Sequence, residues 1–448
     1  MKLLPLDSLK STFSGKIILP SDAEYEATRN SLFKKGSPAI ILQPKTADDV
    51  RTAVQFATKN SLLLSVRSGG HSAAGFSTNE NGLVIDLSLM RKVEIIDKAK
   101  NKVKIEAGAS WYDAATTLKP LHLAISSGDT KTVGVGGLTL GGGVGWLVRK
   151  HGLTIDHLVA AEVVTAEGKI IRTSATEEPD LFWAIRGGGG NFGVVTSFEF
   201  IAQPIGDVFA GHITYGTEHT AEILKGWRDC MRSADESFSS ILTILPSFGG
   251  NPPAIMISCC YASDDEKTAM EAIDPLLHLG KLVSQNISRK AYVDVLEDAH
   301  PPGVRIVVKN VFTEKLSDEM IEAIISAQKK KTDFILQIRS LGGAMNRVAS
   351  DATAFPHRSS EALLICPHFL PANATDEQIK EAVKPWEAIS AFGKGAYSNF
   401  VSDATQKEIQ EMYLGTTYKR LQKIKTMYDP KNIFSQNYNV AQATLSSS

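Results

Sequence analysis

The residues best suited to chemistry in this chain stand among glycines. Of 35 glycines, 15 fall between Gly128 and Gly193. Three glycine-rich segments stand out, and the first contains a histidine: 65–75 (SVRSGGHSAAG), 134–145 (GVGGLTLGGGVG) and 187–193 (GGGGNFG). Glycine loses much backbone entropy on folding, so its clusters are typical of positive φ or of close approach to a ligand. The clusters indicate either tight loops between strands or backbone N–H groups presented to a phosphate-bearing cofactor.

The common phosphate-binding motifs do not account for these glycines. No G-K-[ST] occurs in the chain, so there is no Walker A loop. Gly188, Gly190 and Gly193 satisfy G-x-G-x-x-G, but they follow a helix-like stretch (178–186) and precede a strand-like run (194–200). A dinucleotide fingerprint must follow a strand and open a helix. We therefore reject that match.

Other reactive motifs are missing as well. H-E-x-x-H and G-x-S-x-G do not occur, and His151 and His157 lie six residues apart in a predicted loop. A metalloprotease and a serine hydrolase are therefore not indicated, and no metal site is expected.

The composition is that of an ordinary globular protein. The chain has 448 residues, of which 43% are hydrophobic and 22% charged, enough apolar material for a sizeable core. Its 48 Lys and Arg against 49 Asp and Glu give a net charge of −1. A nucleic-acid partner usually leaves a basic excess, so none is expected.

The cysteines and the N-terminus indicate a cytoplasmic protein. Asp7 and Lys10 interrupt the apolar start before a signal sequence forms. No apolar run approaches the roughly 20 residues that cross a bilayer, so no membrane association is expected. The four cysteines contain no C-x-x-C pair, which leaves zinc ribbons and thioredoxin-like sites unsupported. They are Cys230, Cys259, Cys260 and Cys366.

Periodicity places the glycine segments between short strands and helices in the first half of the chain. An amphipathic helix is predicted over 46–60, with Thr46 as its N-cap, and another over 110–118. Two strands within 156–172 are separated by a turn at Glu167 and Gly168. The remaining strands are predicted at 39–43, 62–66, 83–87, 93–96 and 103–106.

Glycine density falls after residue 203, and Pro204-Ile205-Gly206 interrupts the chain, as at a domain boundary. From 208 to 395 strands alternate with helices, which predicts a second α+β domain. The strands are predicted at 254–260, 303–308, 335–340 and 362–369, and the helices at 264–279, 317–329 and 375–389.

The segment Arg67–Ser72 (RSGGHS) resembles the FAD-linked oxidases of the vanillyl-alcohol-oxidase superfamily, and more closely the berberine-bridge-enzyme-like branch. The likeness continues in family order over nearly the whole chain, through 132–145, 149–156 (RKHGLTID), 180–195 (DLFWAIRGGGGNFGVV), 352–358 (ATAFPHR) and 428–439 (YDPKNIFSQNYN). The resemblance implies an α+β protein with a PCMH-type FAD-binding domain over 1–205. It further implies an inserted α+β substrate domain on an antiparallel sheet over 206–395 and a C-terminal return to the FAD domain over 396–448.

The resemblance also implies how FAD is held. His71 matches the histidine that bonds to the 8α-methyl group of the isoalloxazine, and the N–H groups of Ser68 to Ser72 are expected around the pyrophosphate. Asn437, Tyr438 and Asn439 are expected beside the ribityl chain and ring. The full set of expected cofactor-binding residues is Arg67, Ser68, Gly69, Gly70, His71, Ser72, Thr130, Thr132, Val133, Gly134, Gly137, Gly141, Gly142, Gly145, Leu153, Val194, Val195, Asn437, Tyr438 and Asn439.

The chain departs from many relatives at one covalent position. Thr130 stands where they have the cysteine that bonds to flavin C6, and no cysteine precedes Cys230. We therefore expect a single covalent link, through His71. Val133 corresponds to the oxygen-gate position of the family. A valine there is expected to leave space near flavin C4a, which favours reaction with oxygen.

The catalytic base is not evident. The three positions where relatives carry a tyrosine or an acid hold Phe400, Leu364 and Ala73 here. The remaining candidates are Tyr397, His368 and Tyr438, with His357 and Arg358 as further polar residues. Leu364, Cys366 and His368 share one strand face, so His368 reaches the flavin only if that face points inward. Local hydrogen bonding is the alternative for His368, and a core position is the alternative for Tyr397.

The predicted function is an FAD-dependent oxidase. It takes hydride from a C–H of a small alcohol, sugar or amine and returns the electrons to oxygen as hydrogen peroxide. A dehydrogenase with another electron acceptor, a flavin-carrying structural protein and a flavin reductase without a covalent link are the alternatives. A monomer or homodimer is expected.

Overall fold

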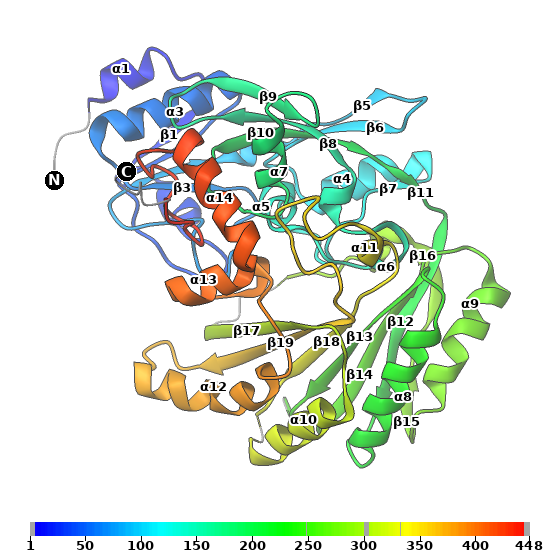
Figure 1. Ribbon diagram of the computed structural model, residues 1–448. Helices are drawn as coiled ribbons and strands as arrows, with labels where there is room; N and C mark the ends of the chain where they lie inside the picture. The colour runs from blue at the N-terminus through cyan, green and yellow to red at the C-terminus, as the bar shows by residue number, and fades with distance from the viewer. Residues whose placement is uncertain (1–4, 248, 300–303, 332, 443–448) are drawn as a thin grey trace.

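The protein, represented by a computed structural model, is described over residues 5–247, 249–299, 304–331 and 333–442. In the view of Figure 1 its elements form an upper and a lower half. The beginning and the end of the chain build the upper half, whereas the middle builds the lower half. The arrangement is α+β, as predicted.

The first sheet of the upper half has four strands in the order β1-β2-β4-β3. Strands β2, β4 and β3 run parallel, and β1 is antiparallel to β2. The predicted cap of α3 is confirmed, because the Thr46 side chain accepts a hydrogen bond from the backbone N–H of Asp49. The elements are α1 (Leu6–Lys10), β1 (Lys16–Ile18), α2 (Tyr25–Thr28), β2 (Ile40–Gln43), α3 (Ala47–Asn60), β3 (Leu64–Arg67), β4 (Leu83–Asp86) and η1 (Leu87–Leu89).

The second sheet is antiparallel, in the order β5-β6-β10-β8-β9, and helix α3 packs between it and the first sheet. A two-stranded ribbon, β7 with β11, lies beside it. Its elements are β5 (Val93–Asp97), β6 (Lys102–Glu106), α4 (Trp111–Leu118), η2 (Lys119–Leu121), β7 (Leu123–Ala124), α5 (Val135–Gly141), α6 (Val148–His151), η3 (Thr154–Asp156), β8 (Leu158–Val164), β9 (Ile170–Ser174), α7 (Pro179–Ile185), β10 (Val194–Ile201) and β11 (Gln203–Pro204).

The lower half is one antiparallel sheet in the order β15-β12-β14-β13-β18-β19-β17, with β16 also paired to β12. Its strands are β12 (Asp207–Tyr215), β13 (Phe238–Leu245), β14 (Ala254–Tyr261), β15 (Leu282–Gln285), β16 (Ser288–Ala291), β17 (Arg305–Thr313), β18 (Leu336–Ser340) and β19 (Ala362–Leu370). The helices of this half are α8 (Thr220–Ser233), α9 (Glu266–Ile273), η4 (Asp274–Leu277), η5 (Tyr292–Val295), α10 (Asp318–Lys330), α11 (Ala344–Arg347) and α12 (Asp376–Ser390).

The two faces of the large sheet belong to different cores. On β19, Leu364 and Cys366 join the core formed with α8, α9, α10 and α12. Their neighbours Leu363 and Ile365 join a smaller core that includes Tyr397 and residues of the upper half. Side chains alternate across a strand, so one face packs under helices and the other faces the upper half (Figure 1).

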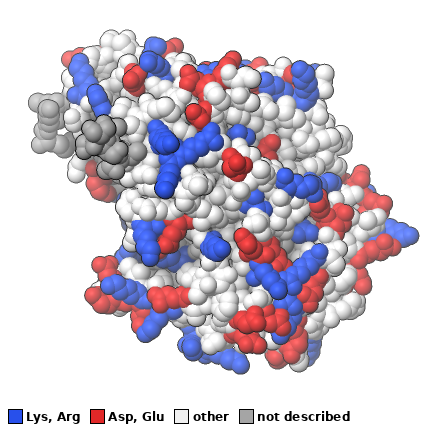
Figure 2. Space-filling model, viewed as in Figure 1, with Lys and Arg blue, Asp and Glu red and all other residues white. Residues whose placement is uncertain are grey.

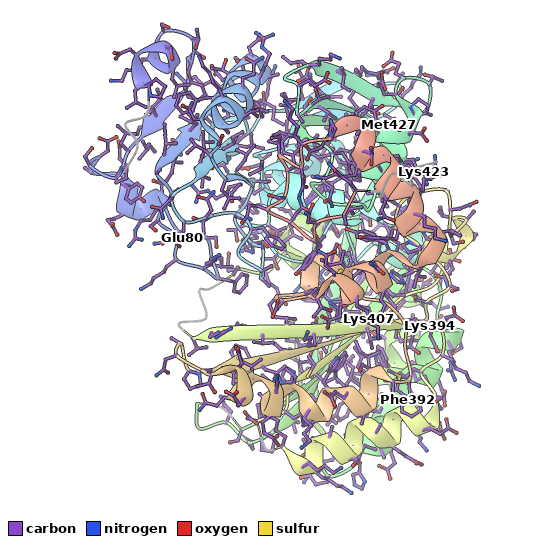
Figure 3. All side chains as sticks on the ribbon, turned by 60° about the vertical axis from the view of Figure 1, so that its left-hand side comes forward. Glu80, Phe392, Lys394, Lys407, Lys423 and Met427 are labelled. Atoms are coloured by element: carbon purple, nitrogen blue, oxygen red, sulfur yellow. The ribbon has the colours of Figure 1, made fainter. Side chains whose placement is uncertain are left out.

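The end of the chain returns to the upper half through η6 (Ser398–Phe400), α13 (Gln406–Tyr413) and α14 (Gly415–Tyr428). Figure 3 shows α14, which carries Lys423 and Met427, against the upper half and Lys407 of α13 near the junction of the two halves. Buried residues of both helices belong to the same core as the first two sheets.

The structure refines two predicted elements of the second half. The helix expected over 264–279 is divided into α9 and η4 at Pro275, which has no N–H for the α-helical hydrogen bond. The strand expected from Gly303 begins at Arg305 and continues to Thr313, and Gly303 itself lies outside the described residues.

Candidate functional site

A cavity of about 490 Å³, called the central cavity below, lies where the glycine-rich segments meet. Its wall includes loop 68–73, parts of 128–134, helix α5, loop 189–195, η6 and the segment around 434–438. The predicted cofactor-binding residues that line it are Ser68, Gly69, Gly70, His71, Ser72, Thr130, Val133, Gly134, Gly137, Gly141, Val194, Val195, Asn437 and Tyr438.

Two glycine loops lie back to back on one side of the cavity. A Cβ added to Gly69 would lie 2.2 Å from the backbone nitrogen of Gly134, and one added to Gly134 would lie 2.0 Å from Ser68 Oγ. The Ser68 hydroxyl donates to the carbonyl of Ala107 (2.6 Å) and accepts from the N–H of Gly136 (3.2 Å). Only glycine allows this backbone approach, which holds the loop that carries His71.

His71 lies between this loop and the cavity. Its Nε2 is 2.8 Å from Thr132 Oγ1, the one hydrogen bond of the ring within the described parts of the chain. Burial lowers the pKa of the imidazole, so the ring is neutral near pH 7. The hydrogen bonds of the described residues therefore involve Nε2 and leave Nδ1 without a partner.

Other glycines leave open space toward the cavity. A Cβ added to Gly137 or to Gly190 would meet no heavy atom within 4 Å. The Oδ1 of Asn437 is buried and has no hydrogen-bond partner among the described residues. Much of the remaining wall is apolar, as at Val66 and Leu138. Open backbone, an unpaired amide oxygen and apolar walls fit the ring and phosphates of FAD.

A buried ion pair fixes the C-terminal side of the site. Lys425 and Asp429 are both fully buried, and their Nζ and Oδ2 are 2.6 Å apart. Lys425 Nζ also donates to the carbonyls of Asn191 (2.9 Å) and Phe434 (3.1 Å). The Asn191 side chain donates to the Tyr438 carbonyl. The pair therefore connects loop 189–195 to the segment that carries Asn437 and Tyr438.

Tyr397 lines the cavity, but its hydroxyl is occupied. The oxygen accepts from the N–H groups of Gly143 (2.9 Å) and Val144 (3.3 Å) and from the side-chain amide of Asn399 (2.8 Å). Burial raises the pKa of Tyr397 although these hydrogen bonds oppose the effect. The Tyr438 hydroxyl donates to the carbonyl of Val401, and burial raises its pKa too. The Tyr397 hydroxyl thus connects the C-terminal part of the chain to Gly143 and Val144, and the Tyr438 hydroxyl connects two stretches of that C-terminal part.

The structure places His368 away from the cavity. It shares a strand face with Leu364 and Cys366, as predicted, but that face packs against the helices. The Nδ1 of His368 lies 3.5 Å from Lys331 Nζ, and burial lowers its pKa to about 4. Because the inward orientation does not occur, this geometry does not support His368 as a catalytic residue. Leu364 likewise faces the helices.

Six predicted cofactor-binding residues do not line the cavity. Arg67 forms a buried ion pair with Asp86 (3.0 Å) under the loop. A Cβ at Gly142 would strike the Phe355 ring, and one at Gly145 would strike the Ser127 carbonyl, so these glycines serve packing. The others are Thr132, which contacts His71, Leu153, which is a fully buried core residue, and Asn439, whose Oδ1 is buried without a partner among the described residues.

Sequence reasoning overlooked an ion pair in the wall of the cavity, where β18 and η6 meet loop 128–134. Asp129 lines the wall, and its Oδ2 lies 2.7 Å from Arg339 Nη1. The guanidinium of Arg339 lies 4.9 Å from the centre of the Phe400 ring. Asp129 and Arg339 are 210 positions apart in the printed sequence. The only available signal was the position of Asp129 directly before Thr130.

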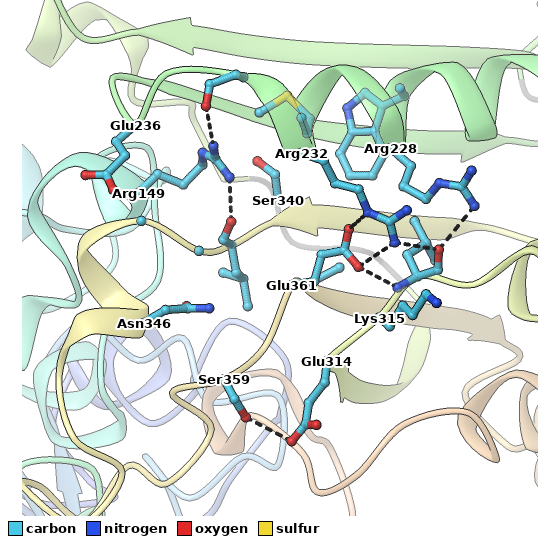
Figure 4. A pocket seen from close by; sticks show the side chains of 18 residues that line it. Arg149, Arg228, Arg232, Glu236, Glu314, Lys315, Ser340, Asn346, Ser359 and Glu361 are labelled. Atoms are coloured by element: carbon cyan, nitrogen blue, oxygen red, sulfur yellow. Dashed lines mark hydrogen bonds and ion pairs between the residues drawn. The ribbon is translucent and has the colours of Figure 1, made fainter.

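A second cavity, of about 600 Å³, lies among α6, α8 and β18 (Figure 4). Among the described residues, six of its seven charged side chains, all except Lys315, form ion pairs or hydrogen bonds within the protein. Arg232 pairs with Glu361 (2.5 Å), and Arg149 donates to the carbonyls of Leu341 (2.7 Å) and Ala234 (3.0 Å). This cavity contains none of the predicted site residues, and we assign the site to the central cavity.

On the face seen in Figure 2, basic and acidic side chains are interspersed. Across the described residues, no helix is long and apolar enough to span a membrane. Within those same ranges, no group of three or more His, Cys, Asp or Glu is arranged to hold a metal ion.

The fold and cavity define a flavin-binding oxidoreductase, and comparisons with known proteins give the family. The FAD binding domain family matches residues 38–174, and the berberine and berberine-like family matches residues 396–441. An uncharacterized FAD-linked oxidoreductase of Bacillus subtilis, YgaK, is 32% identical over 95% of this chain and 96% of its own. The chain therefore belongs to the berberine-bridge-enzyme-like FAD-linked oxidoreductases.

Relatives with named substrates cover the chain equally well. The (R)-6-hydroxynicotine oxidase of Paenarthrobacter nicotinovorans is 30% identical over 96% of this chain and 97% of its own. Glucooligosaccharide oxidase of Sarocladium strictum is 27% identical over 93% and 90%. A solved structure of 6-hydroxy-D-nicotine oxidase from Arthrobacter nicotinovorans matches with a TM-score of 0.86 and 29% identity, covering 96% of this chain and 98% of that one.

Proposed function

We propose that this protein is an FAD-dependent oxidase whose flavin is held covalently by His71 alone. It takes hydride from a C–H of a small alcohol, sugar or amine and passes the electrons to oxygen, giving hydrogen peroxide. The observation that carries the proposal is the meeting of all three glycine-rich segments and His71 around one cavity. FAD supplies the two-electron acceptor in that cavity.

The contacts of His71 support a link through Nδ1. A neutral imidazole has one N–H and one lone pair. If Nε2 donates its N–H to Thr132 Oγ1 (2.8 Å), the lone pair remains on Nδ1. Nδ1 would then be the atom bonded to the 8α carbon; that carbon would lose a proton, and the two electrons left on the flavin would pass to oxygen. Thr132 is thus a positioning residue for the linkage.

A second covalent link is not part of the proposal. Thr130 lines the cavity where many relatives carry cysteine, and its hydroxyl bonds to Asp129 Oδ1 (3.0 Å). The four cysteines are unpaired and lie in the lower half, from Cys230 onward. The thiol required for a link to flavin C6 is therefore missing from the cavity wall.

Use of oxygen rests on Val133. It lines the cavity next to Gly134, and its branched side chain is short. We propose that it leaves a path for oxygen to the reduced flavin. A dehydrogenase with another electron acceptor is the alternative, and peroxide formed per substrate consumed distinguishes the two.

The substrate class is inferred from the relatives. The central cavity, of about 490 Å³, is within the size range of small-molecule sites. The relatives with named substrates act on a hydroxynicotine and on glucooligosaccharides. The proposal also includes a cytoplasmic location, which the four free cysteines support. A monomer or homodimer is part of the proposal as well.

The test is to precipitate the purified protein with acid and measure whether the flavin absorbance stays with the polypeptide. We expect it to stay in the wild type and to be released in His71→Ala. Peroxide release is then measured with cellobiose, maltose and racemic 6-hydroxynicotine. Release of all flavin from the wild type would overturn the covalent assignment.

A further inference from the structure

The central cavity has few groups able to accept a proton. The ionisable side chains of its wall, among the described residues, are His71, Asp129, Tyr397, Tyr413 and Tyr438. The hydroxyl groups of all three tyrosines are hydrogen-bonded to backbone, and burial raises the pKa of each. His71 is committed to the flavin under the proposed function. Asp129 is the remaining ionisable group.

Short contacts hold Asp129 in place. Its Oδ2 lies 2.7 Å from Arg339 Nη1, and its Oδ1 accepts from Thr130 Oγ1 at 3.0 Å. The backbone is fixed as well, because the N–H of Glu297 donates to the Asp129 carbonyl (2.7 Å) and the N–H of Lys131 donates to the Glu297 carbonyl (2.9 Å). The carboxylate is 21% exposed, so a small molecule in the cavity has access to it.

Arg339 links Asp129 to the lower half of the molecule. It stands on β18, and its side chain is 8% exposed. Its Nε donates to Gln337 Oε1 (2.9 Å), and its guanidinium lies 4.9 Å from the centre of the Phe400 ring. Phe400 and Val308 line the cavity together with Asp129. The Asp129 carboxylate therefore lies at the end of the cavity where the large sheet meets the glycine loops.

The surroundings keep Asp129 ionised. Burial alone would raise the pKa of this carboxyl, but the charge of Arg339 and the hydrogen bond from Thr130 outweigh it and lower the pKa. Two other titratable groups lie near. Glu297, from the segment paired with the loop, has its pKa raised by burial and by Asp129, and Tyr292 of η5 has its pKa raised by burial. Neither lines the cavity.

We propose that Asp129 is the catalytic carboxylate, which accepts the hydrogen bond and then the proton of the substrate O–H or N–H, and that Arg339 is its positioning residue. This inference rests on the proposed function. It assigns the base that the three usual positions, Phe400, Leu364 and Ala73, lack.

The chemistry balances as follows. The C–H bond breaks and its electron pair leaves as hydride to the flavin, while the O–H or N–H proton goes to Asp129 and the carbon–heteroatom double bond forms. Oxygen then takes the two electrons and two protons and becomes hydrogen peroxide. As hydride departs, the substrate hydroxyl becomes strongly acidic, so a weakly basic carboxylate suffices.

Sulfite binding tests whether the Asp129–Arg339 pair lies beside the flavin ring, and it requires no known substrate. It is an anion that adds to oxidised flavin and bleaches its absorbance, so its Kd reports charge beside the ring. Asp129→Asn leaves the positive charge of Arg339, and we expect about tenfold tighter sulfite binding. Arg339→Met leaves the carboxylate unpaired, and we expect about tenfold weaker binding. Asp298→Asn is the matched control, because that carboxylate is 64% exposed and pairs with Lys131.

Flavin reduction under anaerobic stopped flow tests the catalytic role. With whichever of cellobiose, maltose or 6-hydroxynicotine reduces the wild type, Asp129→Asn should slow reduction at least 100-fold. Reoxidation of its reduced flavin by oxygen should be unchanged. Arg339→Met should move the acidic limb of the rate-against-pH profile to higher pH, because the charge of Arg339 then no longer opposes the effect of burial on the pKa of Asp129. Arg339→Lys keeps the charge and should restore the profile in part.

The outcomes separate this inference from the proposed function. If the wild type holds no flavin, the proposed function fails. If the wild type and the variants hold flavin but sulfite binding is the same in Asp129→Asn, Arg339→Met and Asp298→Asn, the Asp129 inference alone is overturned. Equal rates of flavin reduction in wild type and Asp129→Asn would overturn it as well.

Discussion

Under the proposed function the central cavity has a cofactor end and a substrate end, and the two are built in different ways. At the cofactor end, glycine loops approach one another so closely that a single Cβ would collide with backbone, as at Gly69 and Gly134. At the substrate end, side chains from separate halves meet, as Asp129 of loop 128–134 meets Arg339 of β18. The cofactor end thus depends on backbone shape, which local sequence encodes. The substrate end depends on contacts between residues far apart in the sequence.

The largest effect on stability is expected at Lys425, the side chain that holds the C-terminal segment at the cofactor end. Lys425→Met leaves Asp429 as an unpaired charge, fully buried in the wild type. Breaking such a pair costs about 3–5 kcal/mol. We expect this loss in the free energy of unfolding, measured by urea denaturation, together with weaker flavin retention. An unchanged urea midpoint would show that the C-terminal segment is not held by this pair.

A matched pair of glycine substitutions distinguishes a glycine required for close backbone packing from a glycine that leaves open space in the cavity. In Gly69→Ala the new Cβ meets Gly134 at 2.2 Å, and we expect a loss of about 1–3 kcal/mol in the free energy of unfolding. In Gly137→Ala the Cβ meets nothing within 4 Å. Since Gly137 lies in α5, the protein without flavin should be equally or up to about 1 kcal/mol more stable.

The readouts for this pair are urea denaturation and flavin content. Gly137→Ala should retain less flavin despite its unchanged stability, because its methyl group enters the cavity. Full flavin content in Gly137→Ala would mean that this part of the cavity is not occupied by the cofactor.

A smaller effect is expected at Thr132. Thr132→Val removes the hydroxyl that selects the reactive nitrogen of His71 without changing the shape of the side chain. We expect covalent incorporation of added FAD to slow about tenfold, the factor given by about 1.4 kcal/mol. Thr132→Ser should restore it. The acid-stable flavin fraction measured over time checks this, and equal rates in the wild type and Thr132→Val would contradict it.

The smallest effect on the rate of flavin reduction is expected at Tyr397, although a loss of stability is expected there. Tyr397→Phe removes one acceptor from the N–H groups of Gly143 and Val144 and from the Asn399 amide. Leaving buried donors unpaired costs about 1–3 kcal/mol. Flavin reduction should change less than in Asp129→Asn. A 100-fold slower reduction in Tyr397→Phe would instead favour the tyrosine as the base.

The sequence predicted the cofactor end better than the substrate end, and the reason is physical. Thr46 was predicted as an N-cap because capping is local, and loop 68–72 was predicted to line a site because its motif is continuous in sequence. The face on which His368 lies depends on which side of the large sheet the helices cover, and periodicity alone does not determine this. The Asp129–Arg339 pair joins positions 210 apart, so no local pattern indicated it.

The most direct test of the account is to digest the purified protein with protease and identify by mass spectrometry the peptide that carries flavin. The account predicts one flavin-bearing peptide, with the mass of FAD or its hydrolysis product FMN attached at His71. No peptide containing Thr130 or a cysteine should carry it. An unmodified His71 peptide as the major species, with flavin free or on another residue, would contradict the assignment of the central cavity as a site of His71-linked FAD.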